Sequence, residues 1–138
     1  MNIDVKSRLD EIGLNPDSAI VIGSGILGAL HIRDIHDIDL VVTEEAYGRL
    51  VQDSRFKKTE THGREILTYG VYEIGINWAV MGKSWDFASL SEHSTVIDGV
   101  RYIDISFLLD VKRSWTAEGD VRQKDLDDIQ LIEDYIKK

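Results

Sequence analysis

Two aspartates separated by one residue form a candidate metal-binding pair. Asp37 and Asp39 stand at the start of an apolar stretch that continues to Val42. Successive side chains of a β-strand point to opposite faces, so both carboxylates would leave the same face, roughly 6 to 7 Å apart. Carboxylates held this close raise each other's pKa, and a bound cation relieves their repulsion. The pair therefore indicates a divalent cation site, and an edge strand with two solvent-facing acids is the alternative.

A glycine-rich turn precedes the aspartates and has two interpretations. Residues 23–28 read GSGILG, which matches the G-x-G-x-x-G fingerprint of dinucleotide-binding folds. Such folds place a full helix between this turn and a second, parallel strand. Here Asp37 follows Gly23 by only 14 residues, which leaves room for a helix of about two turns. The spacing argues against a dinucleotide site, and Gly23 and Ser24 could instead form a phosphate-binding turn, in which backbone N–H groups and a small hydroxyl hold phosphate oxygens. The alternative is an ordinary strand–helix turn in which Gly28 serves close helix–strand packing.

A third carboxylate and a group of basic residues complete the candidates. Glu73 alternates with Tyr72 and Ile74 in a predicted strand, so it would face the aspartates if this strand pairs beside theirs. Asn77 is the competing residue on that face. Basic residues, each of which could equally be a solvated surface residue, collect where two C-terminal helices are expected to meet: Lys112, Arg113, Arg122 and Lys124. Together they would supply positive charge to a bound phosphate.

Hydrophobic periodicity predicts the elements that position these residues. The first part of the chain is expected to form helices over 3–12 and 26–32, strands over 18–22 and 37–42, and a helix capped by Thr43. The polar stretch 53–65 separates these elements from paired strands over 66–69 and 71–78. The second of these strands is expected to bury one face, made of Tyr72, Ile74, Ile76 and Trp78.

The last third of the chain predicts a turn and two helices. An extended piece over 96–105 contains a turn at Asp98-Gly99, and Ser106 is expected to cap the helix that follows. A final helix carries apolar residues at spacings of three and four, which predicts an inner face made of Leu126, Ile129, Ile132 and Ile136.

Composition limits the classes of protein to which this chain can belong. Its 138 residues are 43% hydrophobic, so we expect one domain over residues 1–138. A net charge of -9 argues against a broad nucleic-acid surface but permits local nucleotide binding. The absence of cysteine excludes disulfides, thiolate metal sites and cysteine nucleophiles. We find neither a signal sequence nor the ~20 apolar residues of a membrane span, and therefore expect a cytoplasmic protein with no membrane partner.

The order of these motifs resembles the nucleotidyltransferase superfamily, which includes DNA polymerase beta and the small aminoglycoside and lincosamide nucleotidyltransferases. The shared pattern is Gly-Ser at a strand–helix turn, an Asp-x-Asp strand and a later strand with a third carboxylate. In this chain the corresponding residues are Gly23-Ser24, Asp37-Ile38-Asp39 and Glu73. The tail is similar to small bacterial members in which a lysine on one helix precedes an Arg-x-Lys-Asp-x-x-Asp helix. The resemblance covers residues 18–136, which is nearly the whole chain.

This resemblance implies a fold, a metal and a set of site residues. The fold would be α+β, a nucleotidyltransferase-like mixed β-sheet with helices packed against it, and the metal would be Mg²⁺. The catalytic and metal-binding carboxylates would be Asp37, Asp39 and Glu73, although aspartate is the commoner residue at the third position. The nucleotide-binding residues would be Gly23, Ser24, Lys112 and Lys124, with Asp128 one turn after Lys124 to hold it in place.

The implied activity is that of an enzyme, a magnesium-dependent nucleotidyltransferase. It would move a nucleoside monophosphate from a nucleoside triphosphate to a hydroxyl acceptor on a small molecule, an RNA or a protein. The sequence offers no separate acceptor domain, so a homodimer or a partner subunit would complete the site, or a small acceptor would enter an open cleft. The alternative is a non-catalytic nucleotide-binding or protein-interaction module, such as half of a two-protein, toxin–antitoxin-like system. The two hypotheses differ in whether the third carboxylate functions.

Overall fold

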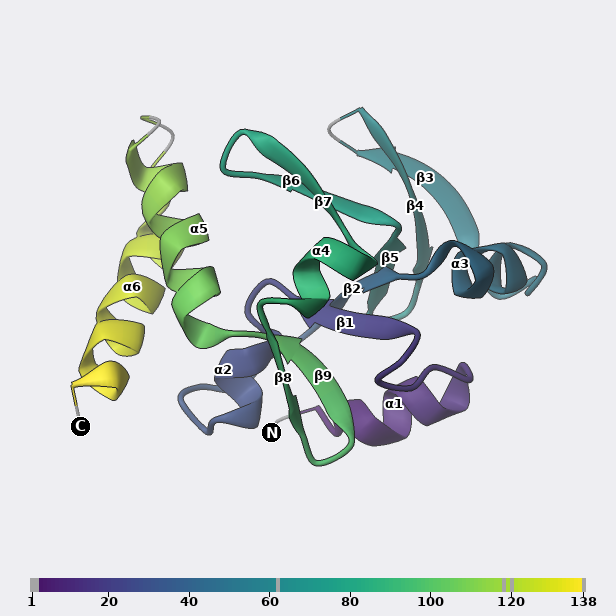
Figure 1. The fold of residues 1–138 in the computed structure, drawn as a ribbon, viewed down its shortest axis with the longest axis horizontal. Helices are drawn as coiled ribbons and strands as arrows, with labels where there is room; N and C mark the ends of the chain where they lie inside the picture. The colour runs from purple at the N-terminus through teal and green to yellow at the C-terminus, as the bar shows by residue number, and fades with distance from the viewer. Residues whose placement is uncertain (1–2, 62, 118, 120, 138) are drawn as a thin grey trace.

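The computed structural model describes residues 3–61, 63–117, 119 and 121–137 and has an α+β architecture (Figure 1). The elements in chain order are α1 (Val5–Glu11), β1 (Ala19–Ile22), α2 (Gly25–Ala29), β2 (Ile38–Val42), α3 (Glu44–Val51), β3 (Lys57–Thr61), β4 (Arg64–Tyr69), β5 (Tyr72–Gly75), β6 (Asn77–Val80), β7 (Lys83–Asp86), α4 (Phe87–Ser91), β8 (Ser94–Ile97), β9 (Val100–Ile103), α5 (Ile105–Ala117) and α6 (Gln123–Ile136). One sheet has the strand order β3-β4-β5-β2-β1-β9-β8, and β6 and β7 form a separate hairpin. Helices α5 and α6 lie side by side at the opposite end of the molecule from β3 and β4 (Figure 1).

The central strands bring residues from three parts of the chain to one level of the sheet. Strand β1 runs antiparallel to β2, and Ile22 pairs with Asp39. Strand β5 lies on the other side of β2 and parallel to it, and Glu73 pairs with Asp39. Paired positions of neighbouring strands place their side chains on the same face. Glu73 is therefore beside Asp39, which is the pairing that its predicted role requires.

Strands β1 and β2 form the middle of the core because both are apolar. All residues of β1 are buried, and Ile38, Leu40 and Val42 of β2 are at most 1% exposed. Val41 is buried as well, so β2 is covered on both faces and only Asp39 in it is partly exposed. Full burial of one such side chain stabilises the fold by about 1.5–3 kcal/mol. The carboxylate of Asp39 is thus attached to a rigid, central strand.

Two predicted helix starts have different outcomes. The Thr43 side chain accepts a hydrogen bond from the backbone N–H of Ala46 at 3.2 Å, so the predicted N-cap of α3 is confirmed. Helix α5 begins at Ile105, so Ser106 lies inside its first turn and the prediction that it caps this helix is wrong. The predicted turn between β8 and β9 is confirmed, since Asp98-Gly99 has the positive φ angles of 50° and 80°.

One strand was not predicted, and one predicted strand is divided between two sheets. The polar stretch 53–65 contains β3, an edge strand whose residues are all exposed or half-buried. Its sequence lacks the apolar alternation of a half-buried strand because neither of its faces is fully covered. The predicted strand 71–78 ends at Gly75, and Ile76, expected in the core, is 37% exposed. The residues Asn77–Val80 leave the large sheet and pair with Lys83–Asp86 instead.

Helix α6 buries only part of the face that was predicted to be inside: Ile132 is buried and Ile129 is half-buried against the core. Its buried residues are Asp125, Asp128 and Ile132. Leu126 and Ile136, which were expected inside, are 41% and 50% exposed. The physical reason is ion pairing, because both carboxylates bind the buried ammonium group of a lysine on α5. This pairing turns Asp125 and Asp128 inward on the same side of α6 as the predicted Ile132.

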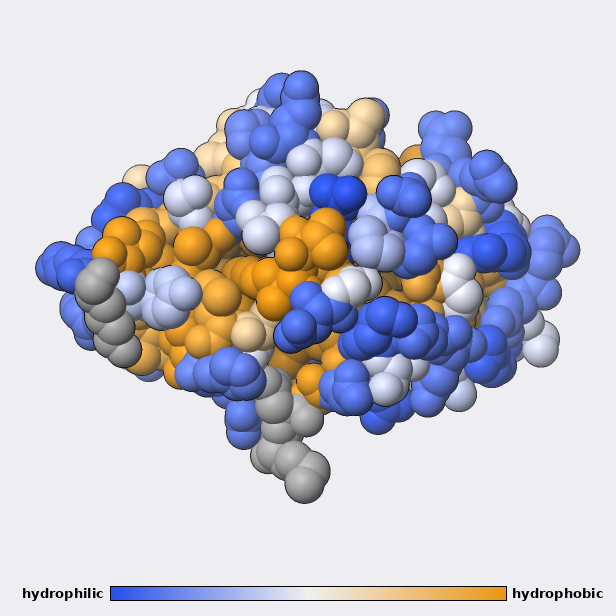
Figure 2. All heavy atoms as spheres, turned by 60° about the horizontal axis from the view of Figure 1, so that its bottom comes forward, coloured by the Kyte–Doolittle hydropathy of each residue, from blue (hydrophilic) through white to orange (hydrophobic). Residues whose placement is uncertain are grey.

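Apolar side chains remain on the surface at the α5–α6 end of the molecule. Figure 2 shows hydrophobic residues gathered over this end. The helix α6 contributes four large side chains that are 36–50% exposed: Leu126, Leu131, Tyr135 and Ile136. An exposed apolar face of this kind is typical of a contact surface. None of the helices in the described ranges is long and apolar enough to cross a membrane.

Candidate functional site

A cavity of about 210 Å³ lies between the start of β2 and the two C-terminal helices. Its walls differ in charge. One wall includes the turn after β1 and the first acids of the β2 region, with Gly23, Ser24, Asp37 and Asp39. The basic wall, as we name it, is made of side chains from the α2–β2 loop, α5 and the start of α6, namely Arg33, Lys112, Arg122 and Lys124, and the acidic Asp125 lines the cavity beside them. A ligand that combines negative phosphates with a bound cation matches both walls.

The turn at Gly23 and Ser24 is shaped by its contact with Asp39. Gly23 has a φ angle of +64°, and a Cβ atom added there would lie 3.1 Å from Asp39 Oδ2. Glycine therefore satisfies both a left-handed backbone and a close approach to the carboxylate. Ser24 is at the N-cap of α2 but makes no side-chain capping hydrogen bond, which leaves its hydroxyl available to a ligand.

The dinucleotide interpretation of this turn conflicts with the topology. A dinucleotide-binding fold needs a parallel second strand and a full helix before it. Here β1 and β2 are antiparallel, and α2 has only five residues. This part of the fold therefore differs from a dinucleotide-binding unit.

The surroundings of Asp39 disfavour the ionised form of its carboxyl group. Burial, a hydrogen bond with Glu73 and the negative charges of Glu73 and Asp37 raise the pKa of Asp39 to about 8. Its Oδ1 atom is buried and accepts no hydrogen bond from the described part of the chain. A buried carboxylate oxygen without a partner costs free energy, which a proton or a cation bound there would offset.

The three predicted carboxylates are near one another but do not form a closed cage. Asp37 is exposed and lines the cavity just before β2 begins, whereas Glu73 is exposed on β5 and does not line it. Within the described ranges, no group of three or more acidic or histidine side chains is arranged to hold a metal ion. Glu73 already forms a hydrogen bond with Asp39, and the exposed Asp37 can turn toward Asp39 at the cost of a rotamer change.

Arg64 is a site residue that the sequence did not reveal. Its guanidinium is half-buried, and burial lowers the pKa of Arg64 while the charges of Asp39 and Glu73 raise it. Its Nη1 donates a hydrogen bond to the Asn77 carbonyl. A Cβ atom on Gly75 would lie 3.3 Å from Arg64 Nη2, so the missing side chain at Gly75 makes room for the guanidinium. In the sequence, only Gly75, on the same face of its strand as Glu73, indicated that a side chain from elsewhere could occupy this position.

The predicted alternative ligand Asn77 has a different role. It lies in the β6–β7 hairpin rather than on β5, and its backbone carbonyl accepts the Arg64 hydrogen bond.

We expect Arg64→Ala to lower the free energy of unfolding by about 2 kcal/mol, because a hydrogen bond from a charged group to a half-buried carbonyl is lost. The loss should be larger at pH 9 than at pH 6, since Asp39 is ionised only above its pKa of about 8 and then needs the nearby positive charge. Urea unfolding at the two pH values tests this. The control is Arg55→Ala, because Arg55 is an exposed arginine paired with Asp53 and should cost less than about 1 kcal/mol.

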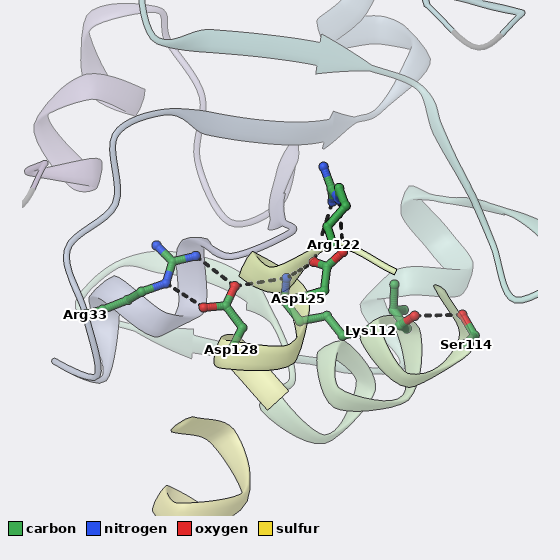
Figure 3. Close-up of polar contacts among 7 residues, drawn as sticks. Arg33, Lys112, Ser114, Arg122, Asp125 and Asp128 are labelled. Atoms are coloured by element: carbon green, nitrogen blue, oxygen red, sulfur yellow. Dashed lines mark hydrogen bonds and ion pairs between the residues drawn. The ribbon is translucent and has the colours of Figure 1, made fainter. Parts of the chain in front are cut away.

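A buried cluster of charges forms the basic wall (Figure 3). Lys112, only 3% exposed, places its Nζ 3.0 Å from Asp125 Oδ1 and 3.1 Å from Asp128 Oδ2. Arg33 donates from Nε and Nη2 to the two oxygens of Asp128 at 2.8 and 2.9 Å, and Arg122 Nε donates to Asp125 Oδ2 at 3.1 Å. Burial raises the pKa of Asp128, but the hydrogen bonds from Arg33 and Lys112 outweigh it and hold that pKa below its usual value.

The cluster changes the predicted roles of the basic residues. Asp128 binds Lys112 and Arg33, so the prediction that it holds Lys124 is wrong. Lys112 is buried between two carboxylates, whereas Lys124 and Arg122 are exposed at the cavity. Lys112 therefore organises the wall, and Arg122 and Lys124 are the cations that a ligand can reach. Arg33 was missed because it lies in a loop, far along the chain from its partner Asp128.

The structure brings most of the predicted site residues together. Six of them line one cavity, namely Gly23, Ser24, Asp37, Asp39, Lys112 and Lys124. The seventh, Glu73, lies beside Asp39 in the sheet and outside the cavity lining. These residues are the basis for assigning a function, because no protein-family model, curated protein or solved structure matches this chain.

Proposed function

We propose that this chain is a magnesium-dependent nucleotidyltransferase, which moves a nucleoside monophosphate from a nucleoside triphosphate to a hydroxyl acceptor. The observation that supports this most directly is the cavity with Asp37 and Asp39 on one wall and basic side chains on the other. Such a cavity pairs a cation-binding edge with a phosphate-binding edge, which are the two requirements of metal-assisted phosphoryl transfer.

The topology supports a nucleotidyltransferase-like fold within this proposal. The glycine-serine turn follows β1, the aspartates flank the start of β2, and the third carboxylate is on β5, which pairs with β2. This is the order that the resemblance in the sequence implies.

The donor chemistry fits magnesium. All candidate ligands are carboxylate oxygens, which magnesium prefers, and the partnerless Asp39 Oδ1 is an oxygen that a cation would satisfy. Asp39 and Asp37 would hold the ion, with Glu73, which lies beside Asp39 on β5, as the third carboxylate. When bound, magnesium would make an acceptor hydroxyl more acidic and neutralise charge on the departing pyrophosphate.

The residues around the ion would bind and orient the triphosphate. The backbone N–H groups of the Gly23-Ser24 turn and the Ser24 hydroxyl would donate to phosphate oxygens. Arg122 and Lys124 would neutralise the negative charge of the pyrophosphate as it leaves. Lys112 would keep this wall in place through its two carboxylate partners.

Pyrophosphate release tests the activity. The protein is incubated with magnesium and labelled ATP, GTP, CTP or UTP, with cell extract supplying acceptors. We expect release with at least one nucleotide and a decrease of at least ~100-fold for Asp39→Asn, which removes a charge that acts on the reacting groups. The matched control is Asp17→Asn, because Asp17 is an exposed acid that does not line the cavity.

A non-catalytic module that binds a partner protein is the second candidate. It is supported by the exposed apolar residues on α6, which a partner could cover: Leu126, Leu131, Tyr135 and Ile136. If the protein binds nucleoside triphosphates with magnesium but releases no pyrophosphate with any extract, this second function is the correct one.

A further inference from the structure

A second cavity, of about 330 Å³, lies against the β6–β7 hairpin. Residues 79–84 of the hairpin form most of its lining, and Trp115 of α5 forms the rest. Trp115 also lines the first cavity. The two cavities therefore adjoin at one aromatic side chain. Figure 1 shows the β6–β7 hairpin and α5 at neighbouring positions in the molecule.

The Trp115 indole is held in place by its neighbours. It meets the Trp78 ring edge to face, with centroids 6.4 Å apart and an angle of 76°. Lys112 Nζ and Arg122 Cζ lie 5.7 and 6.0 Å from its centroid, within the range of cation–π attraction. A half-buried ring with contacts on several sides is a preorganised wall, so a ligand that stacks on it need not order it first.

Trp115 lies beside the basic wall of the first cavity. Lys112 and Arg122, which lie beside the indole, belong to the basic wall of the first cavity. A triphosphate bound at that wall therefore has its attached nucleoside within reach of the ring. Among the described residues, the lining of the second cavity is otherwise small or apolar apart from Lys83 and Ser84, and none of these lining residues is a carboxylate. It suits a flat, uncharged group with a polar edge.

We propose that the second cavity holds the base of the nucleoside triphosphate, stacked on Trp115. This inference rests on the proposed function, because it requires the phosphates of the same molecule to occupy the first cavity. Aromatic stacking on a base contributes about 1–3 kcal/mol, so Trp115 supplies affinity for the nucleoside while the basic wall supplies affinity for the phosphates.

Calorimetric titration separates the two contributions. ATP and inorganic tripolyphosphate, each with magnesium, are titrated into the wild-type protein, Trp115→Leu and Trp115→Phe. We expect Trp115→Leu to weaken ATP binding by about 5- to 150-fold, which corresponds to the loss of one stacked base. Tripolyphosphate binding should change less than about twofold, because it uses the first cavity alone. Trp115→Phe should keep most of the ATP affinity, since it retains a stacking ring.

Each alternative outcome overturns a defined claim. Unchanged ATP affinity in Trp115→Leu would show that the base binds elsewhere and overturn the inference alone. An equal loss for ATP and tripolyphosphate would show that Trp115 acts only through the shape of the first cavity, which also overturns it. Wild-type protein that binds neither ligand would overturn the proposed function, and the inference with it.

Discussion

Replacing Lys112 with methionine is expected to lower the free energy of unfolding by about 3 kcal/mol. Removing one partner of a buried ion pair typically costs 3–5 kcal/mol, because the remaining charge is left uncompensated. Asp125 and Asp128 are 1% and 2% exposed, so water cannot replace the lost ammonium group. Arg33 and Arg122 still hold one carboxylate each, which is why we expect the lower end of that range.

Urea unfolding at pH 7 measures this loss, and the neighbouring residue provides the control. Arg113 is on the same helix and pairs with Glu133, but its side chain is 50% exposed. Arg113→Met should therefore cost less than about 1 kcal/mol. Equal and small effects of the two substitutions would mean that the buried ion pairs of Lys112 stabilise the fold no more than the exposed pair of Arg113.

The pH dependence of the same variants gives a second measurement. The pKa of Asp128 is held below its ordinary value of 3.8, so the stability that this pairing contributes is fully present above pH 3.8. That stability is lost as the pH falls through the lowered pKa. Wild-type protein should therefore lose more stability than Lys112→Met when the pH is lowered from 5 to about 2.

The sequence predicts those parts of the fold that depend on neighbouring residues. Strands β1 and β2 are visible as apolar runs, and Thr43 is visible as an N-cap, because burial and capping are decided within a few positions. Strand β3 is not visible, since an exposed edge strand has no apolar side to mark it. The β6–β7 hairpin was not predicted, although Gly82 lies in its turn, because the apolar alternation of residues 71–78 continues past Gly75, where the chain leaves the sheet.

The same distinction, between features set by neighbouring residues and features set by distant ones, applies to the candidate site. The aspartates and the glycine-serine turn are short motifs, so sequence spacing is enough to identify them. The partners of the basic residues lie far along the chain: Arg33 and Asp128 are 95 residues apart, and Lys112 and Asp125 are 13 apart on different helices. Local periodicity does not indicate such pairs, so it predicted the burial of Ile132 on α6 but not that of Asp125 and Asp128.

Replacing Asp39 with asparagine is expected to abolish magnesium binding while raising the stability of the metal-free protein. Burial, Glu73 and Asp37 raise the pKa of Asp39 from 3.8 to about 8, which means that the folded state disfavours its ionised form. The stability cost of ionising Asp39 grows as the pH rises from 3.8 to about 8 and is complete above that. Asparagine carries no charge at any of these pH values, so its advantage should follow the same course.

Thermal unfolding in chelator at pH 6 and pH 9, and again with magnesium, tests both halves of this prediction. Without metal we expect Asp39→Asn to raise Tm by roughly 4–8 °C at pH 9, and by less at pH 6. Magnesium should raise the Tm of the wild-type protein, since a ligand that binds only the folded state stabilises it, and should leave the variant unchanged. Asp37→Asn is the matched comparison, because Asp37 is exposed and its removal should change the metal-free Tm little while still weakening magnesium binding. If Asp39→Asn lowers Tm at both pH values and magnesium still stabilises the variant, the carboxylate is part of the folded framework, and the metal site lies elsewhere.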